Sequence, residues 1–266
     1  MDRRTFGLGR YRVDTAEPNP ARRYNYWLGG KDNFAVDRAS GDAIEQMFPH
    51  VRAGVHENRR FMQRTVGWLA RCGIRQFLDI GTGIPMPSGN VHDIAQRIAP
   101  ESRIVCVDHD QLVMAHDRAL LMSSPEGRVA YIEADLRDPE GILRNPDLAE
   151  TLDLNEPVAV LIIAVMHFFA DDDDPYGCVS RMMRDLPSGS HLVLSHADQT
   201  NVSPNIGDTH GSFQPRDRRQ VADFFAGLEL ISPGLVSVVD WRPKEPPEPR
   251  FDSSRAAMYG AVAVKL

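Results

Sequence analysis

From residue 75 onward the chain alternates between short apolar runs and amphipathic segments. Each run has the length of a strand, is rich in β-branched residues and is almost continuously hydrophobic, which is typical of strands covered on both faces. The segments between the runs carry apolar residues at helical spacing. The pattern predicts strands at 76–80, 103–108, 129–133, 158–163, 191–195 and 259–264, and helices at 91–99, 111–122, 176–186 and 216–227.

Strands that alternate with helices indicate an α/β fold with a doubly wound, mostly parallel sheet. The last apolar run has no helix after it and follows the run 236–241, which suggests a hairpin-like edge and a total of seven strands. The first 74 residues show no strand pattern, and their periodicity predicts helices at 24–28, 35–47 and 51–71. We therefore expect an N-terminal arm and helical cap over residues 1–74 and a sheet domain over residues 75–266.

Composition and charge narrow the class of protein. The chain has 266 residues, of which 42% are hydrophobic and 25% charged, as in an ordinary globular protein. Its 30 basic and 37 acidic residues give a net charge of −7, which argues against a nucleic-acid partner. The three cysteines form no Cys-x-x-Cys pair, and no stretch reaches the roughly 18 apolar residues that span a bilayer. We expect a cytoplasmic protein with no membrane partner.

The most informative segment joins the first predicted strand to a glycine-rich turn. Gly81 and Gly83 follow this strand directly, and glycine lets a ligand approach the backbone closely. A dinucleotide site would need a third small residue and a helix that begins at once, whose N-terminal amides bind the pyrophosphate. Here the third position is Met86, and Pro85 and Pro87 delay the next helix. A nicotinamide-dependent reductase is therefore a weak interpretation.

Three acidic residues lie at or just after the carboxyl ends of three successive predicted strands. They are Asp79, Asp108 and Asp135, and they should meet at the carboxyl edge of the sheet, where ligands of open α/β sheets bind. S-adenosylmethionine carries no phosphate but presents an ammonium group, a ribose diol and an adenine amino group, from each of which a carboxylate can accept a hydrogen bond. One such acid alone would more often cap a helix. The coincidence of all three with the Gly-x-Gly turn predicts an S-adenosylmethionine site.

These segments resemble a known superfamily. The run Asp79-Ile80-Gly81-Thr82-Gly83 resembles the first motif of class I S-adenosylmethionine-dependent methyltransferases, and Asp108, Ala134-Asp135 and the run that begins at Ala164 match its later cofactor motifs. The resemblance is closer still to an actinobacterial S-adenosylmethionine methyltransferase family formerly catalogued as a domain of unknown function, the DUF574 type. That likeness covers nearly the whole chain and rests on residues 23–34, 58–59, 89–92, 172–176 and 194–197.

The resemblance implies a Rossmann-like class I methyltransferase fold with S-adenosylmethionine as its cofactor. Beside the three acids, it implies cofactor contacts by Gly81, Thr82, Gly83, His109, Leu136 and Ala164. The resemblance does not identify the methyl acceptor.

The cap carries an aromatic pair and a lysine around its glycine pair. Gly29 and Gly30 end a predicted helix in the usual way, which accounts for the glycines alone. We hypothesise that this segment folds over the cofactor and places Tyr26 and Lys31 near the methionine carboxylate.

Two histidines fall where the fourth and fifth strands end. His167 and His196 are candidates for a general base, because the pKa of histidine lies near 7. Each could equally be a hydrogen-bonded histidine at the rim with a packing role. The loop 198–215 is long for a compact domain, so His210, Phe213 and Gln214 are candidates to line the acceptor pocket.

The acidic run 171–174 precedes Pro175 and is better suited to the start of a helix than to a metal. We expect no metal site. The sequence thus predicts an S-adenosylmethionine-dependent methyltransferase that acts on a small-molecule acceptor. The alternative is a non-catalytic S-adenosylmethionine-binding regulatory protein, which would keep the same acids.

Overall fold

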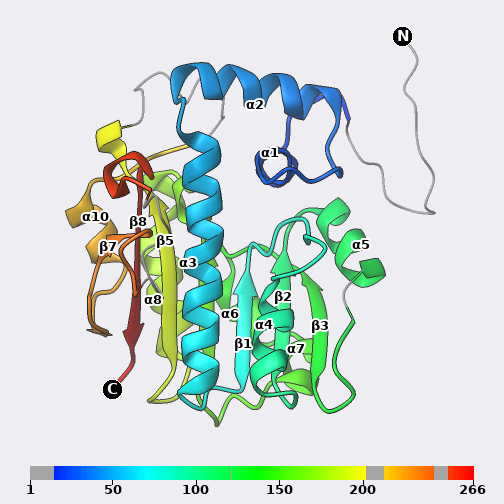
Figure 1. The fold of residues 1–266 in the computed structure, drawn as a ribbon. Helices are drawn as coiled ribbons and strands as arrows, with labels where there is room; N and C mark the ends of the chain where they lie inside the picture. Colours follow the sequence, from blue (N-terminus) through cyan, green and yellow to red (C-terminus); the bar gives the residue numbers. More distant parts are fainter. Residues whose placement is uncertain (1–14, 121, 202–212, 243–250) are drawn as a thin grey trace.

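The computed structural model describes residues 15–120, 122–201, 213–242 and 251–266 (Figure 1). Its centre is an eight-stranded sheet in the order β3-β2-β1-β4-β5-β8-β6, with β7 paired to β8. The pairs among β1 to β5 are parallel, and β8 runs antiparallel to β5, β6 and β7. The strands are β1 (Gln76–Ile80), β2 (Arg103–Asp108), β3 (Arg128–Glu133), β4 (Ala159–Ile163), β5 (His191–Ala197), β6 (Glu229–Leu230), β7 (Val236–Ser237) and β8 (Met258–Val264).

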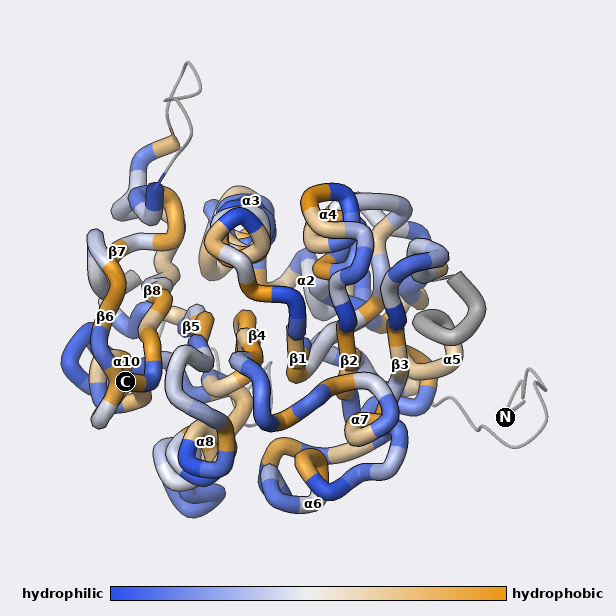
Figure 2. The backbone as a smooth tube through the Cα atoms, turned by 90° about the horizontal axis from the view of Figure 1, so that it is seen from below, coloured by the Kyte–Doolittle hydropathy of each residue, from blue (hydrophilic) through white to orange (hydrophobic). Residues whose placement is uncertain are grey.

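Successive residues of each central strand enter two different cores, because side chains alternate across a sheet. Phe77 packs with α3 and α4 on one face, whereas Leu78 and Ile80 pack with α6, α7 and α8 on the other. Figure 2 shows this three-layer arrangement end-on, with α5 beside the β3 edge. The helices are α1 (Pro20–Trp27), α2 (Ala35–Met47), α3 (Val51–Arg71), α4 (Val91–Ile98), α5 (Gln111–Leu120), α6 (Pro139–Leu143), α7 (Pro146–Thr151), α8 (Pro175–Arg184) and α10 (Arg218–Asp223).

The expected doubly wound, mostly parallel sheet is confirmed, with one difference in strand number. The edge holds two separate two-residue strands, β6 and β7, each paired to β8, so the sheet has eight strands instead of seven. The predicted strand at 236–241 ends at Ser237 because the next residues form turns. Two short helices, α6 and α7, lie between β3 and β4, where no helix was expected.

The N-terminal helices lie over the carboxyl ends of the parallel strands. Figure 1 shows α2 across this end of the molecule, with α1 between α2 and the strands. Helix α3 runs on from there along the sheet, and its apolar side chains between Phe61 and Ala70 belong to or pack against the core shared with α4 and β1. The helical segment that we assigned to the cap therefore also forms one layer of the sheet domain. Among the described helices, none is long and apolar enough to cross a membrane.

The position of α1 is fixed by one buried carboxylate. Asp37, on α2, is fully buried and accepts hydrogen bonds from Arg22 Nε at 2.8 Å, from the Asn19 amide at 2.9 Å and from the Phe34 amide at 2.8 Å. The Arg22 side chain is only 4% exposed, so this ion pair is shielded from water. Asn19 is the N-cap of α1 and also donates from Nδ2 to Asp110 Oδ2 at 2.6 Å, which ties the cap to the loop after β2.

We expect Asp37→Asn to lower the free energy of unfolding by about 3 kcal/mol, because it removes the negative charge from a buried ion pair with Arg22. Urea unfolding, followed by intrinsic tryptophan fluorescence and by far-UV circular dichroism, measures the loss. Glu150→Gln is the matched control, since the Arg128–Glu150 pair is exposed and should contribute less than about 1 kcal/mol. Equal losses in the two variants would contradict a special role for Asp37.

Candidate functional site

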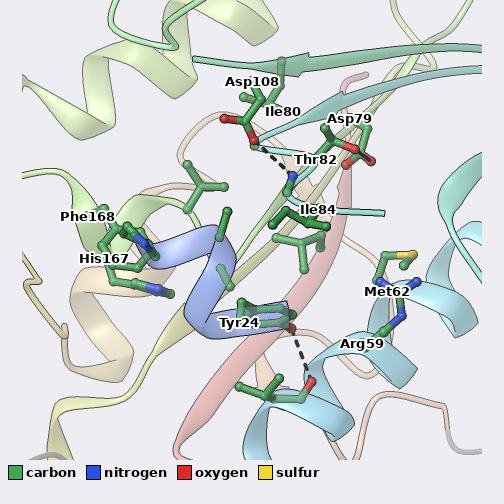
Figure 3. Close-up of a pocket in the computed structure, with 18 of the residues that line it drawn as sticks. Tyr24, Arg59, Met62, Asp79, Ile80, Thr82, Ile84, Asp108, His167 and Phe168 are labelled. Atoms are coloured by element: carbon green, nitrogen blue, oxygen red, sulfur yellow. Dashed lines mark hydrogen bonds between the residues drawn. The ribbon is translucent and has the colours of Figure 1, made fainter. Parts of the chain in front are cut away.

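A pocket with a volume of about 390 Å³ lies between the carboxyl ends of the strands and the N-terminal helices. This volume falls in the range of small-molecule sites, roughly 300 to 1,000 Å³. The pocket lies at the carboxyl edge of the sheet near β1, which has β2 on one side and β4 on the other. This reversal of strand order is where ligands of open α/β sheets bind. Figure 3 shows Asp79 and Arg59 toward one side of it and His167 and Phe168 toward the other.

The glycine turn forms part of the pocket wall. Gly81 has a φ of +69°, and a Cβ there would lie 2.4 Å from Cγ2 of Val165, so both conformation and space require glycine. Gly83 has a φ of +66°, and a Cβ there would meet nothing within 4 Å, so the backbone borders open space. Thr82 donates from Oγ1 to Oδ2 of Asp79 at 3.0 Å. All three turn residues and Asp79 line the pocket, as expected.

Asp79 is a buried acid near a half-buried cation, Arg59. Burial raises the pKa of the Asp79 carboxyl from 3.8 to about 6, although the Thr82 hydrogen bond and the charge of Arg59 lower it. Arg59 lies on α3 and donates from Nη2 to the Ser88 and Gly89 carbonyls and to Asn90 Oδ1. The side chains of Asp79 and Arg59 thus bring opposite charges to the same part of the pocket (Figure 3).

Asp108 ends β2 and faces the glycine turn. Its Oδ2 accepts from the Gly83 amide and its Oδ1 from the Asp110 amide, both at 3.0 Å, so the carboxylate is held in place by backbone donors. Burial raises the pKa of Asp108, and these two amides oppose the rise. His109 lines the pocket from a largely exposed position, with Nδ1 3.7 Å from Asp108 Oδ1.

The third acid, Asp135, also reaches the pocket and is more exposed than the other two. Arg137 pairs with Asp135 at 3.0 Å and with Asp173 at 2.8 Å, and its guanidinium lies 4.5 Å from the ring centre of Phe169. Leu136 is buried beside them and lines the pocket. The structure therefore brings together all three acids that the sequence singled out.

The segment after β4 completes the wall. Ala164 lines the pocket in the left-handed conformation, with a φ of +58°, and its amide donates to Ser195 Oγ at 3.0 Å. His167 also lines the pocket, and its Nδ1 accepts from the Ala197 amide at 3.3 Å. This hydrogen bond fixes the orientation of the His167 ring.

His196 does not line the pocket, which corrects the expectation that it serves as a base. It is fully buried, and burial lowers its pKa to about 3. Arg216 donates from Nη1 to Nε2 of His196 at 3.1 Å, and Nδ1 lies 2.8 Å from the carbonyl oxygen of Ala197. Because a guanidinium only donates, His196 is neutral with its proton on Nδ1. Its role is to hold Arg216, which also donates to the Met166 and Phe169 carbonyls on either side of His167.

Tyr26 and Lys31 are likewise outside the pocket lining, contrary to our hypothesis. Tyr26 donates to Asp42 Oδ1 at 2.8 Å on the outer side of the cap, and Lys31 is exposed. The helical repeat explains the error, because positions two apart on a helix point to different sides. The residues of α1 that line the pocket are Pro20, Ala21, Tyr24 and Trp27, one face of the helix, followed by Leu28.

The loop after β5 is described only in part. His210 lies outside the described residues, whereas Phe213 lines the pocket and the Gln214 amide donates to the His167 carbonyl at 2.6 Å. In the acidic run, Asp174 is the N-cap of α8 and accepts from the Gly177 amide. Asp171 pairs with Arg216 at 2.8 Å. Among the described residues no cluster of three or more His, Cys, Asp or Glu side chains could hold a metal.

The comparisons with known proteins agree with this geometry. A family model described as S-adenosyl methyltransferase matches residues 8–266. The chain belongs to this family. Its cofactor is S-adenosylmethionine, and its activity is methyl transfer. No curated protein sequence matches the chain at a significant level.

Two solved structures resemble the methyltransferase over almost its whole length. A DUF574 family protein from Streptomyces avermitilis is 44% identical, with a TM-score of 0.91, over 96% of this chain and 100% of that one. A candidate methyltransferase from Thermobifida fusca is 34% identical, with a TM-score of 0.85, over 95% and 96% of the two chains. The resemblance to the DUF574 type is thereby confirmed.

A more distant structure shows the fold alone. The plantazolicin methyltransferase BamL, in complex with a triazolic desmethylPZN analog and SAH, is 8% identical, with a TM-score of 0.55, over 92% of this chain and 95% of that one. The Rossmann-like class I fold expected from the sequence is confirmed. Neither the reductase interpretation nor the non-catalytic alternative gains support from any of these likenesses.

The raised pKa of Asp79 predicts a pH-dependent gain in stability for Asp79→Asn. The folded enzyme keeps a proton on Asp79 up to about pH 6, whereas the unfolded chain loses it near pH 3.8, so ionisation destabilises the fold as the pH rises between these values. The asparagine variant escapes this cost, and we expect its advantage in unfolding free energy to be near zero below pH 4. The advantage should reach about 3 kcal/mol above pH 7. Thermal unfolding of both unliganded proteins from pH 4 to pH 8 tests this, and an advantage that falls with pH would contradict it.

Proposed function

We propose that S-adenosylmethionine lies across the carboxyl ends of β1, β2 and β3, and that its methyl group passes to a small-molecule acceptor beneath α1. The observation that carries this proposal is the convergence of the glycine turn and the three acids on one pocket roofed by the N-terminal helices. A roofed cavity of about 390 Å³ suits a small molecule better than a folded protein or a nucleic acid duplex.

The residues present suit each part of the cofactor. Asp79 and Arg59 offer opposite charges for the ammonium and the carboxylate of the methionine part, so Arg59 takes the role that we first gave to Lys31. Asp108 is held by two backbone amides, which orients its remaining lone pairs toward a ribose diol. Asp135, at the exposed rim, suits the adenine amino group, and Leu136 offers an apolar surface for the ring.

When bound, S-adenosylmethionine supplies a methyl group on a positively charged sulfur, and transfer forms a bond from the acceptor to that carbon while the carbon–sulfur bond breaks with its electrons left on sulfur. Alignment of the reacting atoms accounts for much of such a rate enhancement. His167 lines the pocket, and the hydrogen bond from the Ala197 amide to its Nδ1 orients the ring. We therefore propose that the His167 ring contacts the acceptor and helps to align it, and that the acceptor's proton passes to water.

We also propose that the enzyme works in the cytoplasm. None of Cys72, Cys106 and Cys178 forms a disulfide, and Cys72 is exposed, which suits a reducing compartment.

The cofactor assignment predicts that Asp108→Asn and Arg59→Gln each weaken S-adenosylhomocysteine binding by about 10- to 100-fold, the usual effect of losing a hydrogen bond to a charged group. Isothermal titration calorimetry measures the affinity, and circular dichroism confirms that each variant is folded. Lys31→Ala and Tyr26→Phe are the matched controls, since both side chains belong to the cap but do not line the pocket, and their affinity should stay within twofold of the wild type. Unchanged affinity in Asp108→Asn would refute the assignment.

A further inference from the structure

Charge is distributed unevenly around the pocket. The charged lining residues of the described chain come from the middle of α3 and from the ends of β1, β2 and β3. They are Arg59, Asp79, Asp108, Asp110, Asp135 and Arg137. The proposed function places the cofactor against this part, so what remains of the pocket has to receive the acceptor.

The remaining part is an apolar lobe, which we define as Trp27, Leu28, Ile44, Phe48, Val51, Val55, Phe168, Phe213 and Met258. Four of these, from α1, α2 and α3, form one buried cluster, against which Leu28, Phe48 and Phe213 pack. The ring of Phe213 lies 4.9 Å from that of His167 and 5.8 Å from that of Phe168, between ring centres. The lobe is therefore continuous with His167, the residue proposed to hold the reacting group.

The polar groups nearest the lobe are already engaged by the protein. Tyr24 donates from its hydroxyl to the Val55 carbonyl at 3.3 Å and accepts from Asn58 Nδ2 at 3.0 Å (Figure 3). The Trp27 indole donates to the Gly41 carbonyl at 3.4 Å. None of the charged residues that line the described part of the pocket belongs to the lobe, so a charged acceptor there would lose its hydration without gaining a counter-ion among them, which is strongly unfavourable. An apolar acceptor would gain contacts with aromatic rings.

From this arrangement we propose that the acceptor is an uncharged, largely apolar small molecule with an aromatic ring, and that the apolar lobe selects it. The proposal rests on the proposed function, because it assumes that the acidic part of the pocket holds the cofactor. The ring binds among Trp27, Phe48 and Phe213, and the group that receives the methyl lies toward His167.

The test compares three naphthalene probes of similar shape and different charge. The binding of 2-naphthol, a neutral phenol, and of 2-naphthoate, an anion, is measured by isothermal titration calorimetry on the enzyme saturated with S-adenosylhomocysteine. We expect 2-naphthol to bind at least about tenfold more tightly than 2-naphthoate. The cation 2-naphthylmethylammonium should bind as poorly as the anion. Equal or tighter binding of either charged probe, or binding of none of the three, would overturn the proposal.

Variants locate the binding site. Phe213→Leu keeps apolar bulk but removes the ring, and Trp27→Ala removes most of one wall, so both should weaken 2-naphthol binding, the second by about tenfold or more. S-adenosylhomocysteine affinity should stay within about twofold in both. Met47→Ala is the control, because Met47 lies on α2 outside the pocket and is exposed. If Trp27→Ala fails to fold, Phe213→Leu and the comparison of the three probes on the wild type still test whether the apolar lobe selects the acceptor.

Failure of the proposed function looks different. If S-adenosylhomocysteine does not bind the wild-type enzyme, the cofactor assignment is wrong, whatever the naphthalene probes do. If it binds and 2-naphthol shows no preference over the charged probes, the cofactor assignment stands and the apolar lobe does not select the acceptor.

Discussion

The pocket depends on a single buried carboxylate at the base of the cap. Asp37 accepts from the side chain of Arg22 and from the backbone at the starts of α1 and α2, with no exposure to water. These bonds fix where α1 begins and how it is rotated. Rotation decides everything that α1 contributes, because only one of its faces can meet the ligand. With Asp37 in place, that face carries Tyr24 and Trp27.

The acidic part of the pocket contains carboxylates whose ionised form is destabilised by burial. Asp79 and Asp108 are both buried, and burial raises the pKa of each, because an ionised carboxylate there has lost most of its water. Thr82, Arg59 and two backbone amides compensate only in part. A ligand that brings an ammonium group and hydroxyl donors supplies hydrogen bonds to these carboxylates. The acidic part of the pocket is therefore less stable when it is empty than when it is occupied. Such a trade between stability and binding is common at functional sites.

Much of the fold and of the acidic part of the pocket could be predicted from the sequence, because these features depend on residues close together in the chain. Strands β1 and β2 and helices α2 and α3 begin and end where periodicity placed them, since their patterns are long and uninterrupted. The three acids could be found because each lies at or just after the carboxyl end of a strand, and parallel strands end at one edge of the sheet. Helices α6 and α7 were missed because they are five and six residues long, too short for a periodic signal.

The errors concern properties that distant residues set. Tyr26 and Lys31 were chosen for their chemistry, but which side of α1 faces inward is decided by Asp37. Arg59 belongs to the segments that carry the family resemblance, but it was given no role in the site because nothing within α3 reveals that its charge acts on Asp79. His196 was a reasonable base until Arg216, twenty residues later, was found to occupy its Nε2 atom. The burial of a side chain and its hydrogen-bond partners from distant parts of the chain are set by the fold, and a short sequence motif does not reveal them.

Helix α3 contributes to both the pocket and the sheet core, which restricts how its length can vary. Its first half lines the pocket with Val51, Val55 and Arg59, and its second half packs in the sheet core, with no break in 21 residues. Insertion or deletion of one residue between the halves would turn the roof by about 100° against the sheet. Arg59 would then leave Asp79, and Asn58 would leave Tyr24. Substitutions in the roof can alter what the pocket accepts, but the number of residues in α3 has to stay constant.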